Sequence, residues 1–405
     1  MADLPVVCIF GAEKIVLKSA GPVPGFETDD LDCRCYTTDD NLNEILAKDH
    51  PACIMSFGDS RMFPKLNDAP FYIRRMWLHY PDTSDLPAKG FQAFECLLHN
   101  ILEPRKDIPL VTVFTPAYKT ADKITKPYNS LLSQTYKDWE WVILDDSDDD
   151  GRTFDMLSKI AQKDFRVRVY KASQRSGVIG NLKRELCNLG HGEFLLELDH
   201  DDELTPKAIE WMVAAYQKHP EVGFIYSDFA ECFEDGSQFA YGPGWGLGYG
   251  TYREEVHNGI KYQVVNTPRI NAKTIRHIVA APNHFRSWRK KVYDEIGGHN
   301  NLIHVADDYE LMVRTFLATR MALLPKMCYV QYRNQSGNTS LGARNRDIQR
   351  LVRYFSMFYD RRIHDRLLEL GVEDFIWQEG VPSFYRLNTP NQSPESHCTI
   401  VLDDI

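Results

Sequence analysis

The chain has 405 residues, which at roughly 150 residues per domain predicts two or three domains. Hydrophobic residues make up 43% of the chain and charged residues 26%, and this ordinary balance excludes a disordered, collagenous or fibrous protein. The net charge of −10 argues against a non-specific nucleic-acid-binding protein, because such a protein needs a basic face. Any anionic ligand is therefore expected at a local site.

No apolar stretch approaches the roughly 20 residues that cross a bilayer, and the opening MADLPVVCIFGAEK lacks the pattern of a secretory signal. We therefore expect a cytoplasmic protein without a transmembrane segment, while peripheral membrane contact and the oligomeric state stay open. The nine cysteines are scattered without C-x-x-C spacing, which predicts reduced thiols. Cys33 and Cys35 fit the alternation of a strand better than half of a metal site.

Residues 1–104 alternate short apolar runs with helix-like ones, such as PVVCIF, CRCYTT, NLNEILAKDH and PACIMSFG. This alternation predicts a small N-terminal α/β domain. The first predicted strand is not followed by a phosphate-loop glycine pattern, and the sequence does not assign this domain a role. The charged segment near 103–109 contains two prolines and predicts a linker.

From residue 108 the pattern becomes that of a parallel sheet. The runs LVTVFT, WEWVIL, RVRVY and EFLLEL are strand-like, and helix-like stretches separate them. This rhythm predicts a doubly wound α/β domain over 108–340. Ligands of such sheets bind at the carboxyl ends of the strands, and acid clusters follow two of the predicted strands.

Three segments further along have different compositions. Residues 236–275 begin with glycines alternating with aromatic residues, which predicts a mobile loop. Trp245 in this loop is predicted to stack on a sugar as part of a lid, and the alternative is a glycine-rich strand packed against the sheet. Residues 341–390 predict a helical C-terminal extension, and 391–405 a loose tail.

The first acid cluster follows the predicted strand WVIL. Its members are Asp145, Asp146, Asp148, Asp149 and Asp150. Crowded carboxylates repel one another, so the fold must either leave them solvated or use them. The last three predict a polar turn and helix N-cap, whereas Asp145 and Asp146 lie nearer the strand and are candidates for binding a base or ribose.

The second acid cluster has D-x-D-D spacing after LLEL. Alternate residues of an extended chain face the same way, so Asp199 and Asp201 can approach one point. Carboxylate oxygens at this spacing suit Mn²⁺ or Mg²⁺, which take further ligands from substrate phosphates. The structural alternative is capping of the helix that is predicted to begin at Thr205 and Pro206.

Several motifs occur in a characteristic order. These are VTVFTPAYKT, SLLSQTYKDWEWVILDDS, NLKRELCNLGHGEFLLELDHDDELTP, VYDEIGGHN and VADDYELMVR. Together they resemble the family 2 glycosyltransferases, which are inverting enzymes of GT-A fold. The resemblance covers about residues 108–340 and implies a mixed, doubly wound sheet.

The resemblance also implies roles for individual residues. Pro116, Tyr118 and Asp146 match the positions that hold the nucleotide base, and Asp199 and Asp201 match the D-x-D motif, the second binding the metal. A basic residue before the D-x-D strand matches Lys183. Arg184 stands where the family often has asparagine, so the separate roles of these two residues stay open.

The acidic pair before the E-L-x-x-R stretch matches Asp307 and Asp308, and its spacing to Arg314 makes Asp308 the expected catalytic base. An inverting transfer needs one carboxylate to take the proton of the acceptor hydroxyl. The alternative for the pair is an N-cap of the following helix.

One departure from the family concerns the metal site. In the segment YRNQSGNTS, Gln335 stands where many members of the family have a histidine. His304, His284 and Gln335 itself remain unranked candidates for a further ligand, and the histidine spacings do not form a zinc signature.

The leading hypothesis is a metal-dependent inverting glycosyltransferase that moves a sugar from a nucleotide-diphosphate donor, with a UDP-sugar expected, to a hydroxyl of a glycan or other acceptor. One alternative is a sugar nucleotidyltransferase, which would need a glycine-rich basic loop where the sequence has TPAYKTADK. Another is a catalytically inactive carbohydrate-binding protein of the same fold. The sequence does not identify the sugar, because pocket shape sets donor specificity.

Overall fold

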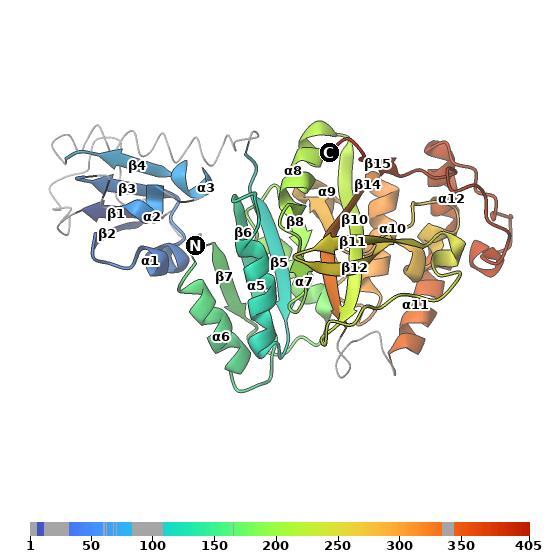
Figure 1. The fold of residues 1–405 in the computed structure, drawn as a ribbon, viewed down its shortest axis with the longest axis horizontal. Coiled ribbons are helices and arrows are strands. Elements are labelled where there is room, and N and C mark those ends of the chain that lie inside the picture. The colour runs from blue at the N-terminus through green and yellow to red at the C-terminus, as the bar shows by residue number, and fades with distance from the viewer. Residues whose placement is uncertain are drawn as a thin grey trace. The chain divides into compact units, whose positions relative to one another are not determined.

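The computed structural model describes residues 6–11, 32–59, 61, 63–67, 69, 71–82, 108–164, 166–333 and 344–405 (Figure 1). The chain divides into two compact units. The smaller comprises Met1–Leu110, Lys137–Trp141 and Asp155–Val169, and the larger comprises Val111–Tyr136, Val142–Phe154 and Tyr170–Ile405. Gln335 lies outside the described residues, so its predicted role is not addressed by the structure.

The N-terminal part of the chain forms a four-stranded parallel sheet in the order β2-β1-β3-β4. Its strands are β1 (Val6–Gly11), β2 (Asp32–Thr37), β3 (Cys53–Phe57) and β4 (Trp77–Tyr80), and its helices are α1 (Leu42–Asp49), α2 (Pro64–Asn67) and α3 (Phe71–Arg74). Cys33 and Cys35 lie in β2, which confirms the strand interpretation of DCRCYTT. The predicted alternation of strands and helices is present here.

The second sheet has 11 strands and a main order of β11-β12-β10-β13-β8-β5-β6-β7, with β14 pairing with β10, β15 and β9. Its strands up to β10 are β5 (Val111–Ala117), β6 (Trp139–Asp145), β7 (Val167–Lys171), β8 (Phe194–Glu197), β9 (Glu203–Leu204) and β10 (Val222–Phe233). The later ones include β13 (Arg286–Arg289) and β14 (Arg320–Arg333). β5 pairs with β8 in parallel, whereas β13 runs antiparallel to β8 and β10, so the sheet is mixed.

Between residues 121 and 318 the structure describes six α-helices, and the first four of them alternate with strands of this sheet, as the apolar rhythm of the sequence predicts. They are α5 (Thr125–Leu132), α6 (Arg152–Ala161), α7 (Ile179–Leu189), α8 (Ala208–Lys218), α9 (Lys290–Glu295) and α10 (Asp307–Ala318), with the short 3₁₀ turns η3 (Ala121–Ile124), η4 (Gly246–Gly248), η5 (Thr274–Arg276) and η6 (Ile278–Ala280). The residue before α8 is Lys207, so the D-x-D-D carboxylates do not cap this helix.

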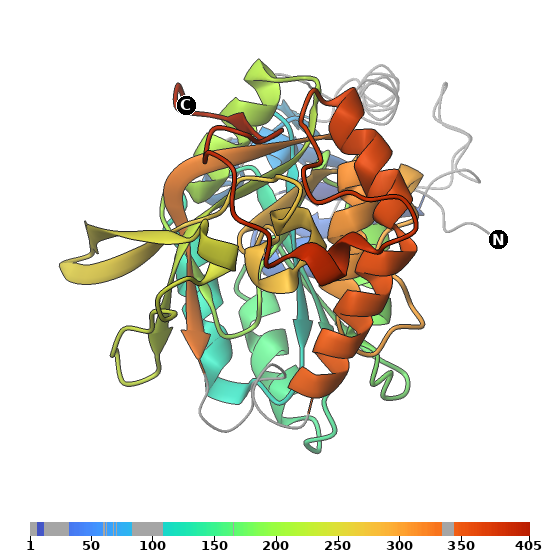
Figure 2. The same cartoon turned by 90° about the vertical axis from the view of Figure 1, so that its right-hand side faces the viewer.

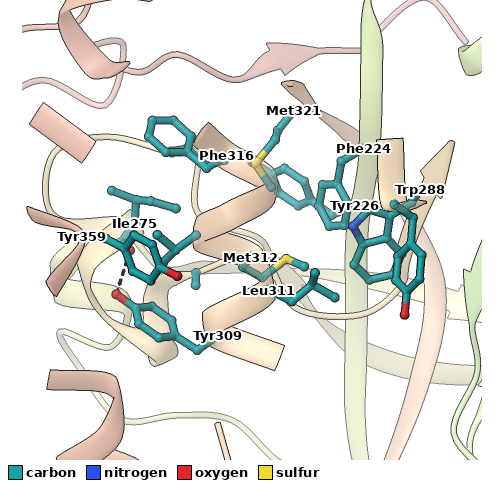
Figure 3. Close-up of a cluster of buried hydrophobic side chains, with 14 of the residues drawn as sticks. Phe224, Tyr226, Ile275, Trp288, Tyr309, Leu311, Met312, Phe316, Met321 and Tyr359 are labelled. Atoms are coloured by element: carbon teal, nitrogen blue, oxygen red, sulfur yellow. Dashed lines mark hydrogen bonds between the residues drawn. The ribbon is translucent and has the colours of Figure 1, made fainter. Parts of the chain in front are cut away.

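The core of the larger unit lies between α10 and the sheet (Figure 3). Phe224 and Trp288, from adjacent strands β10 and β13, pack edge to face at 5.0 Å, and Leu311 and Met312 of α10 are buried with them. Burying each such side chain contributes roughly 1.5–3 kcal/mol, so α10 is held firmly against the sheet. This packing fixes the N-terminus of α10, where the predicted catalytic pair lies.

The expectation of an irregular mobile loop over 236–275 is wrong for part of this segment. Two strands, β11 (Thr251–His257) and β12 (Ile260–Asn266), form an antiparallel hairpin, drawn in yellow in Figure 2. Asn258 and Gly259 join them with φ values of 51° and 76°. Positive φ at both central residues is the signature of a tight type I′ turn, for which Asn-Gly is the preferred dipeptide.

The C-terminal region contains α11 (Asn345–Phe358), α12 (Asp360–Glu369) and the short turn η7 (Ser383–Arg386). The fully buried Arg276 of η5 ties this region to the larger unit, because its guanidinium contacts Asp360 at 2.8 Å and Asp374 at 2.7 Å. Two buried carboxylates around one arginine give each charge a partner. The helical extension therefore packs as part of the larger unit.

The prediction of a loose tail over 391–405 is also wrong. Strand β15 (Ile400–Val401) pairs in parallel with β14, and Leu402 is fully buried. The run CTIVL supplies the apolar β-branched residues that a short strand needs. No helix in the described parts of the chain is both long and apolar enough to cross a membrane.

Candidate active site

Asp146 connects three segments at the carboxyl end of β6. Its carboxylate accepts hydrogen bonds from the backbone N–H groups of Ser176 at 2.7 Å and Gly177 at 3.3 Å, just before α7. Its own N–H donates to the carbonyl of Ala117 at the end of β5. The predicted base-binding aspartate therefore also holds the turn that leads into α7.

Asp145 is 1% exposed, and its Oδ1 accepts from the backbone N–H and hydroxyl of Ser147. Its Oδ2 has no hydrogen-bond partner in the described structure, and burial raises the pKa of this carboxyl group. Pro116 is buried within β5. Tyr118 is partly exposed and donates to Asp148 at 3.1 Å, so the structure brings the predicted nucleotide-binding residues to one edge of the sheet.

The D-x-D-D segment follows β8, and a buried tyrosine organises it. The hydroxyl of Tyr329 donates to Asp202 at 2.8 Å and accepts from the N–H of Asp199 at 3.1 Å. The backbone N–H of Tyr332 donates to the other oxygen of Asp202 at 2.7 Å. Burial raises the pKa of Asp202 well above its usual range, and the neighbouring carboxylates of Asp201 and Asp199 add to this effect.

His284 brings a nitrogen atom to this acid cluster. Its ring is 4% exposed and stacks on Tyr329 at 4.6 Å, and its Nε2 lies 3.6 Å from Oδ2 of Asp199. Burial, assisted by Arg286, lowers the pKa of His284 to about 4, so the imidazole is neutral at physiological pH and has a free lone pair.

Asp199, Asp202 and His284 each offer a ligand atom within 4.8 Å of the others. Two carboxylates and one neutral imidazole are a donor set that suits Mn²⁺ and similar divalent ions. Asp201 is not a member of this group, which was found among the described residues. The structure thus gathers one of the two predicted ligands, Asp199, with His284, one of the candidates for a further ligand, and with Asp202.

A chain of buried charges lies beside the acid cluster. Lys183 of α7 contacts Glu197 of β8 at 2.5 Å, and Arg286 of β13 contacts the same carboxylate at 2.9 Å. Burial alone would lower the pKa of Lys183, but Glu197 and Asp307 raise it above its usual range, so it is a cation. The neighbouring Arg184 is exposed.

Asp307 and Asp308 open α10 in different environments. Asp307 is 5% exposed and its Oδ2 has no hydrogen-bond partner in the described structure, and burial raises its pKa to about 6. Asp308 is more open, with 34% of its side chain exposed, and Arg286 contacts its Oδ2 at 3.2 Å. The preceding residue, Ala306, makes no side-chain cap, and Asp308 accepts the N–H of Tyr309 at 2.7 Å.

We compared the sequence with models of known protein families. The model of glycosyl transferase family 2 matches residues 112–297. These residues form a family 2 glycosyltransferase domain. The match and the mixed α/β sheet confirm the predicted fold class, an α/β sheet of GT-A type, and confirm the resemblance on which it was based.

Two chondroitin synthases that are similar to this chain are longer than it is. Chondroitin synthase of Pasteurella multocida is 26% identical over 243 residues, which cover 60% of this chain and 22% of that protein. Chondroitin synthase of Escherichia coli is 25% identical over 272 residues, which cover 67% of this chain and 34% of that protein. The chain therefore spans about a fifth to a third of the length of these two relatives.

Among solved structures, S. aureus TarS in complex with UDP-GlcNAc has a TM-score of 0.47 and 17% sequence identity. The match covers 64% of this chain and 73% of the TarS chain.

Trp245 of the family 2 domain packs within its own segment. Its ring stacks on Tyr241 at 5.3 Å and is tilted against Tyr252 at 5.5 Å. A Cβ atom on Gly250 would lie 2.1 Å from the Trp245 ring, so only glycine permits this approach. The ring is part of a small aromatic cluster formed within its own segment.

Sequence reasoning missed three residues that organise the acidic site of the family 2 domain, namely Glu197, Arg286 and Tyr329, and it gave no separate role to Asp202 of the D-x-D-D cluster. One signal was available for Glu197, because a charged residue inside the otherwise apolar run EFLLEL requires a buried partner. The partner could not be identified from the sequence, since Arg286 is 89 residues away and reaches Glu197 only through the pairing of β13 with β8.

Proposed function

We propose that this protein is a metal-dependent, inverting glycosyltransferase that uses a nucleotide-diphosphate sugar, with UDP as the expected nucleotide. The observation that carries the proposal is a single sheet edge that holds two separate acidic groups, one beside a neutral histidine and one held by an arginine. The first is suited to a divalent ion, and the second to proton transfer. The family 2 match supports sugar transfer as the reaction.

The group of Asp199, Asp202 and His284 supports a divalent ion, Mn²⁺ or Mg²⁺, at this place. The D-x-D motif adds Asp201, with Asp199, as an expected ligand. Such an ion would offset the negative charge that develops on the departing diphosphate. Lys183, a buried cation beside the cluster, would contribute positive potential on the same side. The nucleotide would be held by Pro116, Tyr118, Asp145 and Asp146. No separate role is assigned to Arg184.

Asp308 would act as the general base. Its carboxylate takes the proton of the acceptor hydroxyl, whose oxygen forms a bond to the anomeric carbon as the bond from that carbon to the diphosphate oxygen breaks. One displacement of this kind inverts the anomeric configuration and needs no covalent intermediate. The partial exposure of Asp308 is consistent with access by an acceptor, whereas Asp307 is buried.

A glycan is the proposed acceptor class, because two relatives are named as chondroitin synthases. Three further statements also remain predictions from the sequence. These are the domain limits, the cytoplasmic location and the absence of a nucleic-acid partner. The N-terminal sheet has no assigned role.

The proposal is tested by incubating the protein with UDP-, GDP- and dTDP-sugars and Mn²⁺ or Mg²⁺, with glycan acceptors, and by determining the anomeric configuration of the product by NMR. Metal-dependent transfer with inversion is expected. A folded protein that neither binds nor hydrolyses any donor would contradict the proposal, and pyrophosphate release from a nucleoside triphosphate and a sugar phosphate would favour a nucleotidyltransferase.

A further inference from the structure

Arg286, the first residue of β13, contacts carboxylates from two different elements. Its Nε and Nη2 lie 2.9 and 3.1 Å from the two oxygens of Glu197 in β8, and its Nη1 lies 3.2 Å from Oδ2 of Asp308 in α10. The arginine is 4% exposed. One rigid guanidinium therefore connects the central sheet to the residue proposed as the catalytic base.

Glu197 keeps this arginine in place. It is fully buried and also accepts from Lys183 at 2.5 Å, so two cations surround one carboxylate. Moving Arg286 away would leave a buried carboxylate with half of its pairing, which is costly in a low-dielectric interior. The arginine is also fixed by the strand, since the next residue, Ser287, pairs with Leu196 of β8.

The contact with Asp308 has a different character. Asp308 is 34% exposed at its side chain whereas Glu197 is 0% exposed, so Arg286 holds its inner end in the core and presents its outer nitrogen to a carboxylate that solvent can reach. Because Glu197 is shared between Arg286 and Lys183, the arginine keeps positive charge that attracts Asp308, and its planar guanidinium sets the direction of that contact. Among the charges that act on Asp307, Lys183 has the largest effect, and it lowers the pKa of this carboxyl group against the effect of burial.

We propose that Arg286, anchored by Glu197, is a positioning residue that holds the carboxylate of Asp308 in the direction needed to accept the proton of the acceptor hydroxyl. This inference rests on the proposed function. Positioning matters because a general base must lie within hydrogen-bonding reach of the proton it removes, and small displacements lower the rate strongly. The forked guanidinium suits the task, since a lysine ammonium is a single point and cannot keep both carboxylates in place.

The first experiment compares Arg286→Lys and Arg286→Gln with a control arginine on the same strand. Arg289→Lys is the control, because Arg289 donates to the carbonyls of Val222 and Tyr216 and touches neither acidic group of the site. We expect kcat to fall by about 10-fold to 10²-fold in Arg286→Lys and further in Arg286→Gln, with KM for the donor and the affinity for UDP with Mn²⁺ within about threefold of wild type. The control should keep its kcat.

The second experiment separates positioning from a general structural effect. Arg286→Lys is combined with Asp308→Asn, and the four kcat values form a double-mutant cycle. If Arg286 acts through Asp308, its substitution should cost less than about twofold once Asp308 is gone. Thermal denaturation of each variant, together with its affinity for UDP in the presence of Mn²⁺, identifies any variant that has not folded. If Arg286→Gln does not fold, the test relies on Arg286→Lys.

Two outcomes overturn the inference while leaving the proposed function intact. One is a full additional loss of kcat when Arg286→Lys is placed on the Asp308→Asn background, and the other is a loss confined to nucleotide affinity. A wild-type protein that is folded but transfers no sugar instead sinks the proposed function, and the positioning role with it.

Discussion

The hydroxyl of Tyr329 joins Asp202 to the segment that carries the predicted metal ligands. It donates to Asp202 at 2.8 Å and accepts the backbone N–H of Asp199 at 3.1 Å, while its ring stacks on His284. One side chain of β14 thus sets the conformation of the D-x-D-D turn and the orientation of the nearby histidine. The geometry of the proposed metal site therefore depends on a residue that lies about 130 positions along the chain from the motif.

Tyr329→Phe should keep the ring stack but remove both hydrogen bonds. We expect the affinity for UDP in the presence of Mn²⁺ to fall by about 10-fold, because ligands that are no longer oriented bind the metal more weakly. Isothermal titration calorimetry measures this change. Tyr216→Phe is the matched control, since Tyr216 is equally buried and its hydroxyl donates to the carbonyl of Ser287 instead. Equal affinities in both variants would mean that the Tyr329 hydroxyl does not organise the site.

Asp201→Ala should abolish both transfer and the metal-dependent binding of nucleotide, if Asp201 is the main ligand that the D-x-D motif predicts. The structure offers a clear alternative, because Asp199, Asp202 and His284 lie together without it. Manganese-dependent affinity for UDP that survives in Asp201→Ala and is lost in His284→Gln would assign the metal to this other group.

How much of this site could be predicted depended on the distance along the chain between interacting residues. The D-x-D motif and the Asp307–Asp308 pair could be recognised because each is a local pattern that follows a strand or begins a helix. Glu197 and Arg286 could not be connected, since their contact depends on the pairing of β13 with β8, which no local pattern encodes. The same applies to Tyr329, which reaches the motif only because β14 pairs with β9.

The fold was predictable where periodicity was strong and less so where glycine was frequent. The buried strands β5, β6 and β8 are continuous apolar runs and were expected. The hairpin of β11 and β12 was missed because the glycine-rich residues before it suggested an irregular loop, although Asn258–Gly259 between two alternating segments is itself a turn signal. The pairing of β15 was missed because a chain end is usually loose.

Asp308→Asn should leave donor and metal binding intact while kcat falls by about 10² to 10⁴, because the general base affects only the chemical step. Calorimetry with UDP and Mn²⁺, together with steady-state kinetics, separates the two effects. Near-normal turnover in this variant would move the base to Asp307, whose own Asp307→Asn variant should then carry the loss.

Asp307→Asn should change the pH dependence of stability. Burial raises the pKa of Asp307 to about 6, so the folded protein holds this proton more tightly than the unfolded chain does. As pH rises through that range, the folded protein must ionise a buried group, and wild-type stability falls relative to the variant by about 1.4 kcal/mol for each unit of pKa difference. The Tm advantage of Asp307→Asn should therefore grow between about pH 4.5 and pH 7.5 in EDTA.

The control for this pH series is Asp122→Asn, because 82% of the Asp122 side chain is exposed. The Tm difference between this variant and wild type should stay constant. A variant that instead loses stability as pH rises would show that attraction between Asp307 and Lys183 outweighs the cost of burial.

The last prediction concerns the glycine-rich segment before the β11–β12 hairpin. Trp245 lies between Tyr241 and Tyr252 and against Gly250, where an added Cβ would meet its ring at 2.1 Å. Gly250→Ala should therefore displace the ring, and Trp245→Ala should remove it. If the segment folds over a bound sugar, both variants should raise KM for donor or acceptor while changing Tm little, because aromatic rings stack on the C–H faces of sugars.

Limited proteolysis provides the independent measurement, with wild-type cleavage in this segment slower in the presence of UDP and Mn²⁺ than in their absence. Cleavage at the same low rate in both states, together with a large fall in Tm for Trp245→Ala, would mean that the ring is a packing element and that the segment does not act as a lid.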